Sequence, residues 1–307
     1  MGASSSRPTK TRFSVIIPTL NEAEHIRETV GSARADSSSD VEIIVVDGGS
    51  SDKTKALARA AGAKVLSAPR GRGTQLNAGW RACRGEWCIF LHGDSQLPPN
   101  FQRLVGDAVG ATTADGAQRR WFGAEPKGRA RWGAFRTIET EFHDTLSGRV
   151  LSFGVAMRMQ LLHMPYGDQA IFVERKTLQE LGGFRDWPFL EDYEMVRRLR
   201  SVSAPAIVPA ALATSGRRWA TVGFLRTWAL NQAVLAGYHT GVDIDTLGRW
   251  YQSWRYVGDA AAGHGASWQV SRLGTGTGGT KHMQHRAAGI FMQAPFQQPQ
   301  APQQSLQ

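Results

Sequence analysis

The sequence predicts an α/β fold in which a mostly parallel β-sheet is flanked by helices within a single domain. Two observations carry this prediction. Short, fully apolar strand-like runs alternate with helix-like segments through the first half of the chain, and such strands are typical of parallel sheets covered on both faces. Four of these runs also end in polar loops that contain glycine. Ligands of open α/β sheets bind beyond the carboxyl ends of the strands.

The elements of the first half follow one another regularly. Strands are predicted at 13–17, 42–46, 63–66 and 87–91, where β-branched and other apolar residues dominate. Helices are predicted at 23–35, 52–61 and 74–83, where apolar residues such as Ile26 and Val30 recur at helical spacing. This alternation predicts a Rossmann-like layer.

The second half is less regular, and its ends differ from the middle. Strands are predicted at 169–174 and 206–208, and helices at 175–181, 191–201 and 221–235. We expect one domain over residues 12–257. Residues 1–11 form a polar leader, and residues 258–307 form a tail rich in Gly, Ala, Gln and Pro. Neither end can bury enough apolar area to offset its ordering entropy, so both are predicted to be disordered.

The composition is that of a basic globular protein. The chain has 307 residues, 41% of them hydrophobic, and 36 Lys and Arg against 26 Asp and Glu give a net charge of +10. This content excludes disorder of the whole chain. Its apolar stretches are shorter than the roughly 18 residues that a membrane-spanning helix needs. Cys83 and Cys88 are the only cysteines, which favours a reducing compartment and two buried thiols over a disulfide framework.

Polar residues follow each of the first four strands, in the loops 18–22, 47–52, 70–77 and 92–95. An acidic side chain after the second strand can accept hydrogen bonds from a ribose or a base, and glycines allow a close backbone approach. The arginines of the third loop can neutralise phosphate, and Asp94 is an oxygen ligand suited to Mg²⁺ or Mn²⁺. Together the loops predict a nucleoside diphosphate site.

Each loop also has a simpler interpretation. Asp47-Gly48 is an ordinary turn dipeptide, and Ser50 or Ser51 can cap the following helix. The segment Gly71–Gly73 can be a flexible loop. Because all four loops follow successive strands, we favour the binding site.

Four segments carry a family resemblance: SVIIPTLNE at 14–22, VVDGGSSD at 45–52, GRGTQLNAG at 71–79 and FLHGDS at 90–95. They resemble the motif series of family 2 glycosyltransferases, which have the GT-A fold. In the second half, YGDQAIF at 166–172, LGGF at 181–184 and LEDYE at 190–194 are similar to acceptor-side segments of the same enzymes. The resemblance covers roughly residues 12–236.

The resemblance implies roles for individual residues. Glu22 and Asp47 would hold the nucleoside, Asp94 would bind the metal, and Asp192 or its neighbour Glu191 would be the catalytic base. The other donor-binding residues would be Pro18, Leu20, Gly48, Gly49, Arg70, Arg72, Gln75, Asn77 and His92. The acceptor side would be formed by Asp168, Gln169, Arg218 and Trp219. A simpler interpretation of Glu191 and Asp192 is a helix start stabilised by the helix dipole.

The sequence departs from the family pattern at two places. His92 stands where the first Asp of the Asp-x-Asp motif is expected, which leaves fewer metal ligands. The resulting His-x-Asp is similar to the variant of a bacterial-type subgroup labelled arsenosugar biosynthesis glycosyltransferases. Residues 214–219 resemble the Gln-x-x-Arg-Trp box of processive members, but Ser215 stands in place of Gln, which argues against processive polymerisation.

The activity implied is inverting, metal-assisted transfer of a sugar, a hexosyl group, from a nucleotide-sugar donor to an acceptor hydroxyl. We expect a UDP-linked donor and Mn²⁺ or Mg²⁺ as cofactor. A single in-line displacement needs a base and neutralisation of the leaving diphosphate, and no covalent nucleophile.

Two alternatives remain open at this stage. A sugar-1-phosphate nucleotidyltransferase would carry a glycine-rich phosphate loop after the first strand, where this chain has Pro18–Glu22. A nucleic-acid-binding protein is suggested by the net charge and by the basic, aromatic stretch at 119–136. The alternative for that stretch is a solvated loop, and the acidic residues at the strand ends would repel a nucleic acid.

The sequence also bears on location. We expect a cytoplasmic protein with no nucleic-acid partner. The helix at 221–235 is rich in apolar residues and lies near Arg217, Arg218 and Arg226, so peripheral contact with an anionic membrane is one expectation. The alternative is that this helix packs on its own domain. The start Met-Gly-x-x-x-Ser fits an N-myristoylation signal, or simply a disordered leader.

Overall fold

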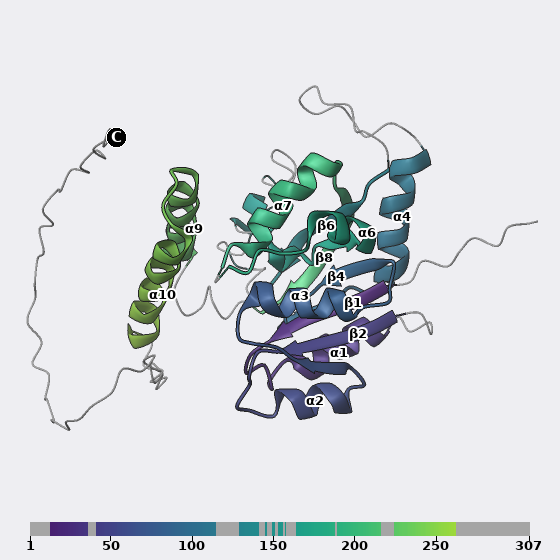
Figure 1. Ribbon diagram of the computed structural model, residues 1–307, viewed down its shortest axis with the longest axis horizontal. Coiled ribbons are helices and arrows are strands. Elements are labelled where there is room, and N and C mark those ends of the chain that lie inside the picture. Colours follow the sequence, from purple (N-terminus) through teal and green to yellow (C-terminus); the bar gives the residue numbers. More distant parts are fainter. Residues whose placement is uncertain are drawn as a thin grey trace, which may run out of the picture. The chain divides into compact units, whose positions relative to one another are not determined.

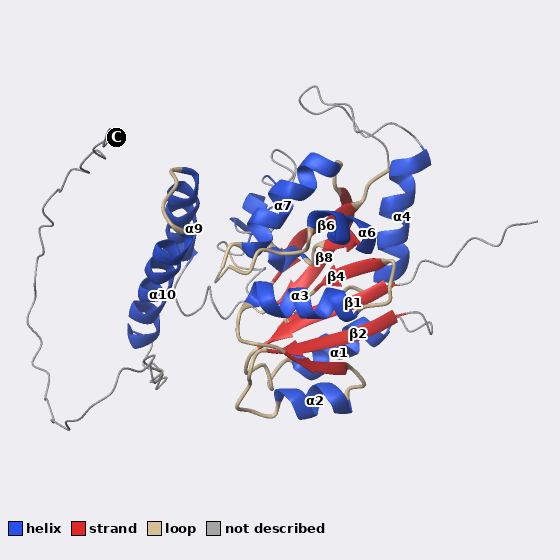
Figure 2. Cartoon of the chain, viewed as in Figure 1, coloured by secondary structure: helices blue, strands red, loops and turns tan. Residues whose placement is uncertain are grey.

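A computed structural model describes residues 13–35, 41–114, 129–140, 145, 149–150, 153–155, 157, 164–187, 189–215 and 224–261. These residues contain an eight-stranded sheet with the strand order β3-β2-β1-β4-β7-β6-β8-β5, flanked by helices (Figures 1 and 2). The α/β fold predicted from the alternating apolar runs is therefore confirmed.

The first half of the sheet is parallel. β1 (Phe13–Thr19) lies between β2 (Val41–Asp47) and β4 (Trp87–Phe90), and β2 pairs with β3 (Lys64–Ser67). The helices α1 (Ile26–Ala35), α2 (Thr54–Ala60) and α3 (Arg72–Ala82) connect these strands. All seven elements lie within a few residues of their predicted positions.

The second half of the sheet is mixed. β7 (Phe172–Glu174) runs antiparallel to β4 and to β6 (Trp132–Glu139). β6 is parallel to β8 (Ala206–Thr214), which pairs antiparallel with the short edge strand β5 (Ser95–Gln96). The predicted strand at 169–174 is shorter in the structure, because the 3₁₀-helix η1 (Gly167–Gln169) occupies its beginning.

Alternate residues of β1 face two different hydrophobic cores. Val15 and Ile17 pack in one core with α1 and with α4 (Phe101–Ala114). Ile16 packs in the other core with α3, α6 (Arg175–Leu181) and α7 (Glu191–Val202). Because side chains alternate along a strand, a strand that is apolar throughout must be covered on both faces. This explains the continuous apolar runs in the sequence.

The basic, aromatic stretch at 119–136 is only partly described, since residues 115–128 lie outside the described ranges. Within it, Trp132 and Phe135 belong to β6 and are completely buried. Their rings therefore cannot stack on nucleic-acid bases, and this part of the stretch is a core strand. Arginines lie before and within β6, so its apolar residues do not form an uninterrupted run in the sequence.

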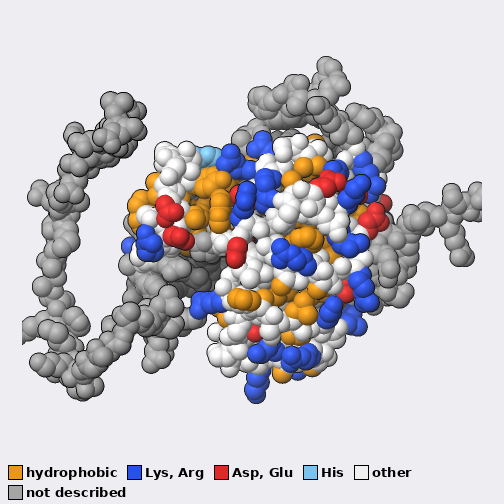
Figure 3. Space-filling view, in the orientation of Figure 1, with side chains coloured by type: hydrophobic (Ala, Val, Ile, Leu, Met, Phe, Trp, Pro, Cys, Tyr) orange, Lys and Arg blue, Asp and Glu red, His pale blue; other side chains and the backbone are white. Residues whose placement is uncertain are grey.

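Two helices follow the sheet. α9 (Phe224–His239) confirms the core of the predicted 221–235 helix, of which residues 221–223 lie outside the described ranges. α10 (Ile244–Ala261) packs on α9 and continues past residue 257. No helix within the described ranges combines the length and the apolar character needed to cross a membrane. Figure 3 shows Lys and Arg side chains over much of the visible face, in keeping with the positive net charge.

Candidate functional site

The loops that follow β1 and β2 are joined by hydrogen bonds. Asn21 has a left-handed φ of 56°, which Asn tolerates better than most residues. Its N–H donates to Oγ of Ser50 at 2.9 Å, and its Oδ1 accepts from the N–H of Ser51 at 2.9 Å. The N–H of Glu22 donates to Oγ1 of Thr54 at 2.8 Å. The loop that carries Glu22 is therefore fixed against the loop that carries Asp47.

Asp47 is the last residue of β2 and is completely buried. Its Oδ2 accepts from the N–H groups of Gly49 and Ser50, both at 3.0 Å, and lies 3.8 Å from Nζ of Lys55. Its Oδ1 is also buried and has no hydrogen-bond partner within the described part of the chain. Burying a polar oxygen without a partner costs free energy. A ligand N–H or O–H that reached Oδ1 would remove this cost.

Three of the predicted site residues hold the candidate site in place through hydrogen bonds to backbone groups. Nε2 of Gln75 donates to the carbonyl oxygens of Thr19 and Val46 at 2.9 and 2.8 Å. Nε2 of Gln169 donates to the carbonyl oxygen of Phe135 at 2.9 Å. Both side chains are buried, so Gln75 holds the backbone at the ends of β1 and β2, and Gln169 holds the backbone in the middle of β6.

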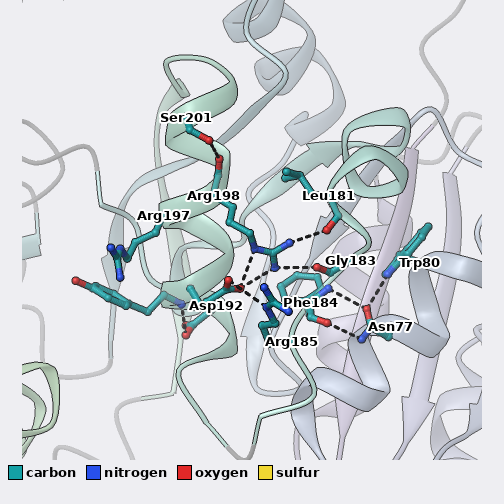
Figure 4. Close-up of polar contacts among 12 residues, drawn as sticks. Asn77, Trp80, Leu181, Gly183, Phe184, Arg185, Asp192, Arg197, Arg198 and Ser201 are labelled. Carbon is teal, nitrogen blue, oxygen red and sulfur yellow. Dashed lines mark hydrogen bonds and ion pairs between the residues drawn. The ribbon is translucent and has the colours of Figure 1, made fainter. Parts of the chain in front are cut away.

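The third supporting residue is Asn77, on α3. Its Nδ2 donates to the carbonyl oxygen of Phe184 at 2.9 Å, and its Oδ1 accepts from the N–H of Phe184 at 3.0 Å and from Nε1 of Trp80 at 2.9 Å (Figure 4). A Cβ added to Gly183 would lie 2.5 Å from Oδ1 of Asn77. The loop before α7 is therefore clamped to α3.

The same loop is held from α7 itself. Arg198 donates to the carbonyl oxygens of Leu181 and Gly183, both at 2.8 Å, and to Oε2 of Glu194 at 2.7 Å (Figure 4). Leu190, which precedes α7, has a left-handed φ of 60°. These contacts fix where the first turn of α7 begins, and with it the positions of Glu191 and Asp192.

Arg72 begins α3 and lies at the centre of the acidic residues. Its Nε is 2.9 Å from Oε1 of Glu191, and its Nη2 donates to Nε2 of His92. Burial lowers the pKa of Arg72, but attraction by nearby carboxylates outweighs this and raises the pKa overall. In order of strength these carboxylates are Glu191, Asp192, Asp168 and Asp94. Four predicted carboxylates from three separate segments thus act on one guanidinium.

Gly167, in η1, marks the point where these side chains meet. A Cβ added at this glycine would lie 2.6 Å from Oδ2 of Asp192, 2.7 Å from Nη2 of Arg72 and 3.2 Å from Nε2 of His92. The N–H of Gly167 donates to Oδ2 of Asp192 at 2.6 Å. Only a residue without a side chain allows this approach. No role was predicted for Gly167, although its place next to Asp168 in the YGDQAIF segment was an available signal.

Glu191 and Asp192 point in different directions, as residues adjacent in a helix do. Glu191 is buried against Arg72, and burial raises its pKa to about 7 although Arg72 opposes the shift. Asp192 lines a small cavity together with polar and apolar residues from both halves of the sheet. The cavity is lined by Pro18, Arg72, Leu76, Phe90, Leu91, His92, Gly167, Ile171, Phe184 and Asp192.

Asp94 follows β4 and is held by the end of β8. Its carbonyl oxygen accepts from the N–H of Ser215 at 3.1 Å, and Oγ of Ser95 lies 2.8 Å from Oγ1 of Thr214. Within the described ranges, no group of three His, Cys, Asp or Glu side chains could hold a metal ion. Mg²⁺ at a nucleotide site is usually held by one or two carboxylates together with phosphate oxygens. Asp94 therefore fits a metal that a bound diphosphate helps to hold.

An aromatic cluster adjoins the site on the α9 side. The hydroxyl of Tyr193 lies 2.6 Å from Nε2 of His239. The Tyr193 ring packs edge-on against Tyr166 and Tyr238, with centroids 6.4 and 5.6 Å apart. His239 thereby joins α9 to α7, a contact between segments far apart in the sequence.

The remaining predicted residues differ in position. Arg70 is exposed, and Leu20 is partly buried in the loop after β1. Arg218 and Trp219 lie outside the described ranges.

A mixed α/β sheet with acidic side chains gathered at the carboxyl end of its parallel half defines the class: a GT-A glycosyltransferase fold. The chain belongs to glycosyl transferase family 2, whose model matches residues 14–171.

Two curated relatives and a solved structure are similar to this chain. An uncharacterized glycosyltransferase of Rickettsia typhi is 39% identical over 90 residues, which cover 28% of this chain and 28% of that protein. An uncharacterized protein of Mycobacterium tuberculosis is 28% identical over 242 residues, 75% of each chain. The crystal structure of S. aureus TarS is similar in fold, with a TM-score of 0.51 and 14% identity over 70% of this chain and 38% of that chain.

Proposed function

We propose that this chain is an inverting glycosyltransferase that moves a sugar from a UDP-linked donor to an acceptor hydroxyl with the help of a divalent metal. The observation that carries the proposal is the meeting of Asp192, Arg72 and His92 around Gly167, beside a cavity lined by β1, β4 and α7. The family match favours this activity over the nucleotidyltransferase alternative.

The donor would bind along the carboxyl ends of the strands. Oδ1 of Asp47 is buried and accepts no hydrogen bond in the described structure, so it would accept one from the nucleoside. Glu22 lies in the loop fixed against the Asp47 loop and would bind the same part of the donor. Arg72 would face the diphosphate, because its positively charged side chain lines the same cavity as Pro18 and His92.

Asp94 would hold the metal, which when bound would neutralise negative charge on the leaving diphosphate. Asp192 would remove the proton from the acceptor hydroxyl. Its Oδ2 accepts from the N–H of Gly167 at 2.6 Å and its Oδ1 from the N–H of Tyr193 at 2.7 Å, so the carboxylate is fixed in orientation. A positioned carboxylate base contributes about a hundredfold or more in rate. Asp168, beside Gly167, would lie on the acceptor side.

A panel of nucleotide sugars and nucleoside diphosphates tests the proposal, with melting temperature measured in Mn²⁺ and in EDTA. We expect UDP or a UDP-sugar to raise the melting temperature more in Mn²⁺ than in EDTA. Asp94→Ala should remove this difference, whereas Asp107→Ala, an exposed position on α4, should keep it. Equal protection in both buffers would contradict the metal, and no protection by any compound would contradict the donor site.

We also propose that the two C-terminal helices contact an anionic membrane surface. Trp228 on α9 and Trp250 on α10 are 55% and 49% exposed, and the exposed Arg226 and Arg249 lie beside them in the sequence. Tryptophan favours membrane interfaces, and arginine pairs with anionic headgroups. Vesicle flotation should show binding that Trp228→Ser weakens, while Val150→Ser, at another exposed apolar residue, should not. Equal flotation with neutral and anionic vesicles would contradict this contact.

A further inference from the structure

Two thiols lie in contact at the far end of α3 and β4 from the candidate site. Cys83 follows the last residue of α3, and Cys88 is the second residue of β4. Their sulfur atoms are 3.1 Å apart, and both residues are buried. A disulfide needs a sulfur–sulfur distance of about 2.05 Å. An approach of the two sulfurs by roughly 1 Å would therefore suffice to join them.

The loop between the two cysteines is held in place by its backbone. The N–H of Arg84 donates to Oε2 of Glu42 at 2.8 Å, and the N–H of Gly85 donates to Oγ of Ser14 at 2.9 Å. A Cβ added to Gly85 would lie 2.6 Å from the backbone nitrogen of Ser14. Since the backbone is fixed on both sides, the thiols stay adjacent, and the bond needs mainly side-chain rotation.

The two thiols are not equivalent. The hydrogen bond with Cys88 lowers the pKa of Cys83 against the opposing effect of burial, with smaller contributions from Ser14 and Arg175. The same hydrogen bond, together with burial, raises the pKa of Cys88. The thiolate is the reactive form of cysteine, so Cys83 is the thiol that reacts first.

We propose that Cys83 and Cys88 are a redox modification site that a peroxide converts to an internal disulfide. The Cys83 thiolate attacks one oxygen of hydrogen peroxide, and hydroxide leaves, which leaves a sulfenic acid on Cys83. The sulfur of Cys88 then attacks the sulfur of Cys83, its proton is transferred, and water leaves. In sum, two thiols and one peroxide give one disulfide and two waters, and a dithiol reverses the reaction.

The disulfide would link the end of α3 to the start of β4. Arg72 is the first residue of α3, and His92 follows β4. Cys83 follows the carboxyl end of α3, whereas Arg72 begins this helix. The bond therefore forms at the opposite end of α3 from the candidate site. We expect it to raise the melting temperature, because a cross-link reduces the freedom of the unfolded chain, and to leave nucleotide binding unchanged. The inference thus does not depend on the proposed function.

Intact-mass measurement of the full chain before and after native peroxide treatment tests this site. We expect the mass of two hydrogen atoms to be lost, N-ethylmaleimide labelling in denaturant to fall from two thiols to none, and dithiothreitol to restore both. Because the chain has only two cysteines, a peptide that joins residues 83 and 88, found together with the intact mass of a monomer, identifies the bond within one chain. Cys83→Ala and Cys88→Ala each keep a single thiol. After peroxide treatment this thiol should either still react with N-ethylmaleimide or carry added oxygen, and no internal disulfide should form.

Two results would overturn the inference. One is retention of both labelled thiols after treatment, and the other is addition of oxygen to both cysteines of the wild-type chain without a joined peptide. Because the peptide map uses the wild-type protein, it decides the question even where a variant fails to fold. A disulfide found only between two chains would count against the site as well.

Discussion

Nε of Arg72 lies 2.9 Å from Oε1 of Glu191, so the first residue of α3 is paired with the first residue of α7. The Glu191 side chain is only 3% exposed, whereas that of Arg72 is 36% exposed. The pair therefore joins a buried carboxylate to a guanidinium that reaches the cavity. It also links the start of α3 to the helix that carries Asp192.

The Glu191 carboxyl should make stability depend on pH. Burial raises its pKa to about 7 from the ordinary value of 4.5, so between these values the folded state keeps a proton that the unfolded state has lost. Its contribution to stability is then full below about 4.5 and is lost as pH rises through about 7. We predict that the free energy of unfolding of the wild type, relative to Glu191→Gln, falls across this window in urea titrations.

Asp107→Asn, at an exposed position on α4, is the control that removes a surface carboxylate. A wild-type advantage that rises with pH would mean that Glu191 is charged throughout and that the ion pair with Arg72 dominates.

Asp47→Asn should weaken nucleotide binding. The carboxamide can still accept the N–H groups of Gly49 and Ser50 through its oxygen, but it then presents NH₂ where Asp47 presents the unpaired Oδ1. A hydrogen bond to a charged group contributes about 1.5–3 kcal/mol, so the Kd for UDP should rise about tenfold or more. Calorimetric titration measures this, and Asp107→Asn should leave the Kd unchanged. An unchanged Kd in Asp47→Asn would remove Asp47 from the donor site.

Gly167→Ala should impair the site while the fold remains. The new methyl would lie 2.6 Å from Asp192 Oδ2 and 2.7 Å from Arg72 Nη2, which forces both side chains to move. We predict at least a tenfold loss of sugar transfer, since small displacements at an active site cost about a hundredfold in rate.

The matched control is Gly106→Ala on α4, where an added Cβ meets nothing within 4 Å. This variant should keep full activity and gain about 0.5–1 kcal/mol of stability, because alanine is the better helix former. If both variants behaved alike, the close approach at Gly167 would have no functional meaning.

The first half of the sheet could be predicted because local signals agree there with the tertiary structure. The middles of β1 and β2, at 15–17 and 43–46, are apolar without interruption, and Pro18 and Gly48 mark the ends of these runs. The second half could not be predicted to the same extent. β5 has two residues and exists through its pairing with β8, and Gly106 and Gly110 weaken the helical pattern of α4.

The residues of the candidate site could be named from the sequence, but the contacts among them could not. Asp47, Arg72, His92 and Asp192 could be named from their places after strands or from the family motifs. The sequence could not show that Gln75, Asn77 and Gln169 bind backbone groups, because those contacts join segments far apart in the chain. Nor could it show that Glu191 turns to Arg72 while Asp192 lines the cavity.

Turnover by Asp192→Asn is the most direct test of the central claim, that this edge of the sheet transfers a sugar with Asp192 as base. The measurement is release of nucleoside diphosphate from the nucleotide sugar that the wild type binds, in the presence of a verified acceptor. The account predicts that Asp192→Asn keeps donor binding and melting temperature but loses a hundredfold or more of the rate, while Glu191→Gln loses less. Near-normal turnover by Asp192→Asn would contradict it and make Glu191 or Asp168 the candidate base.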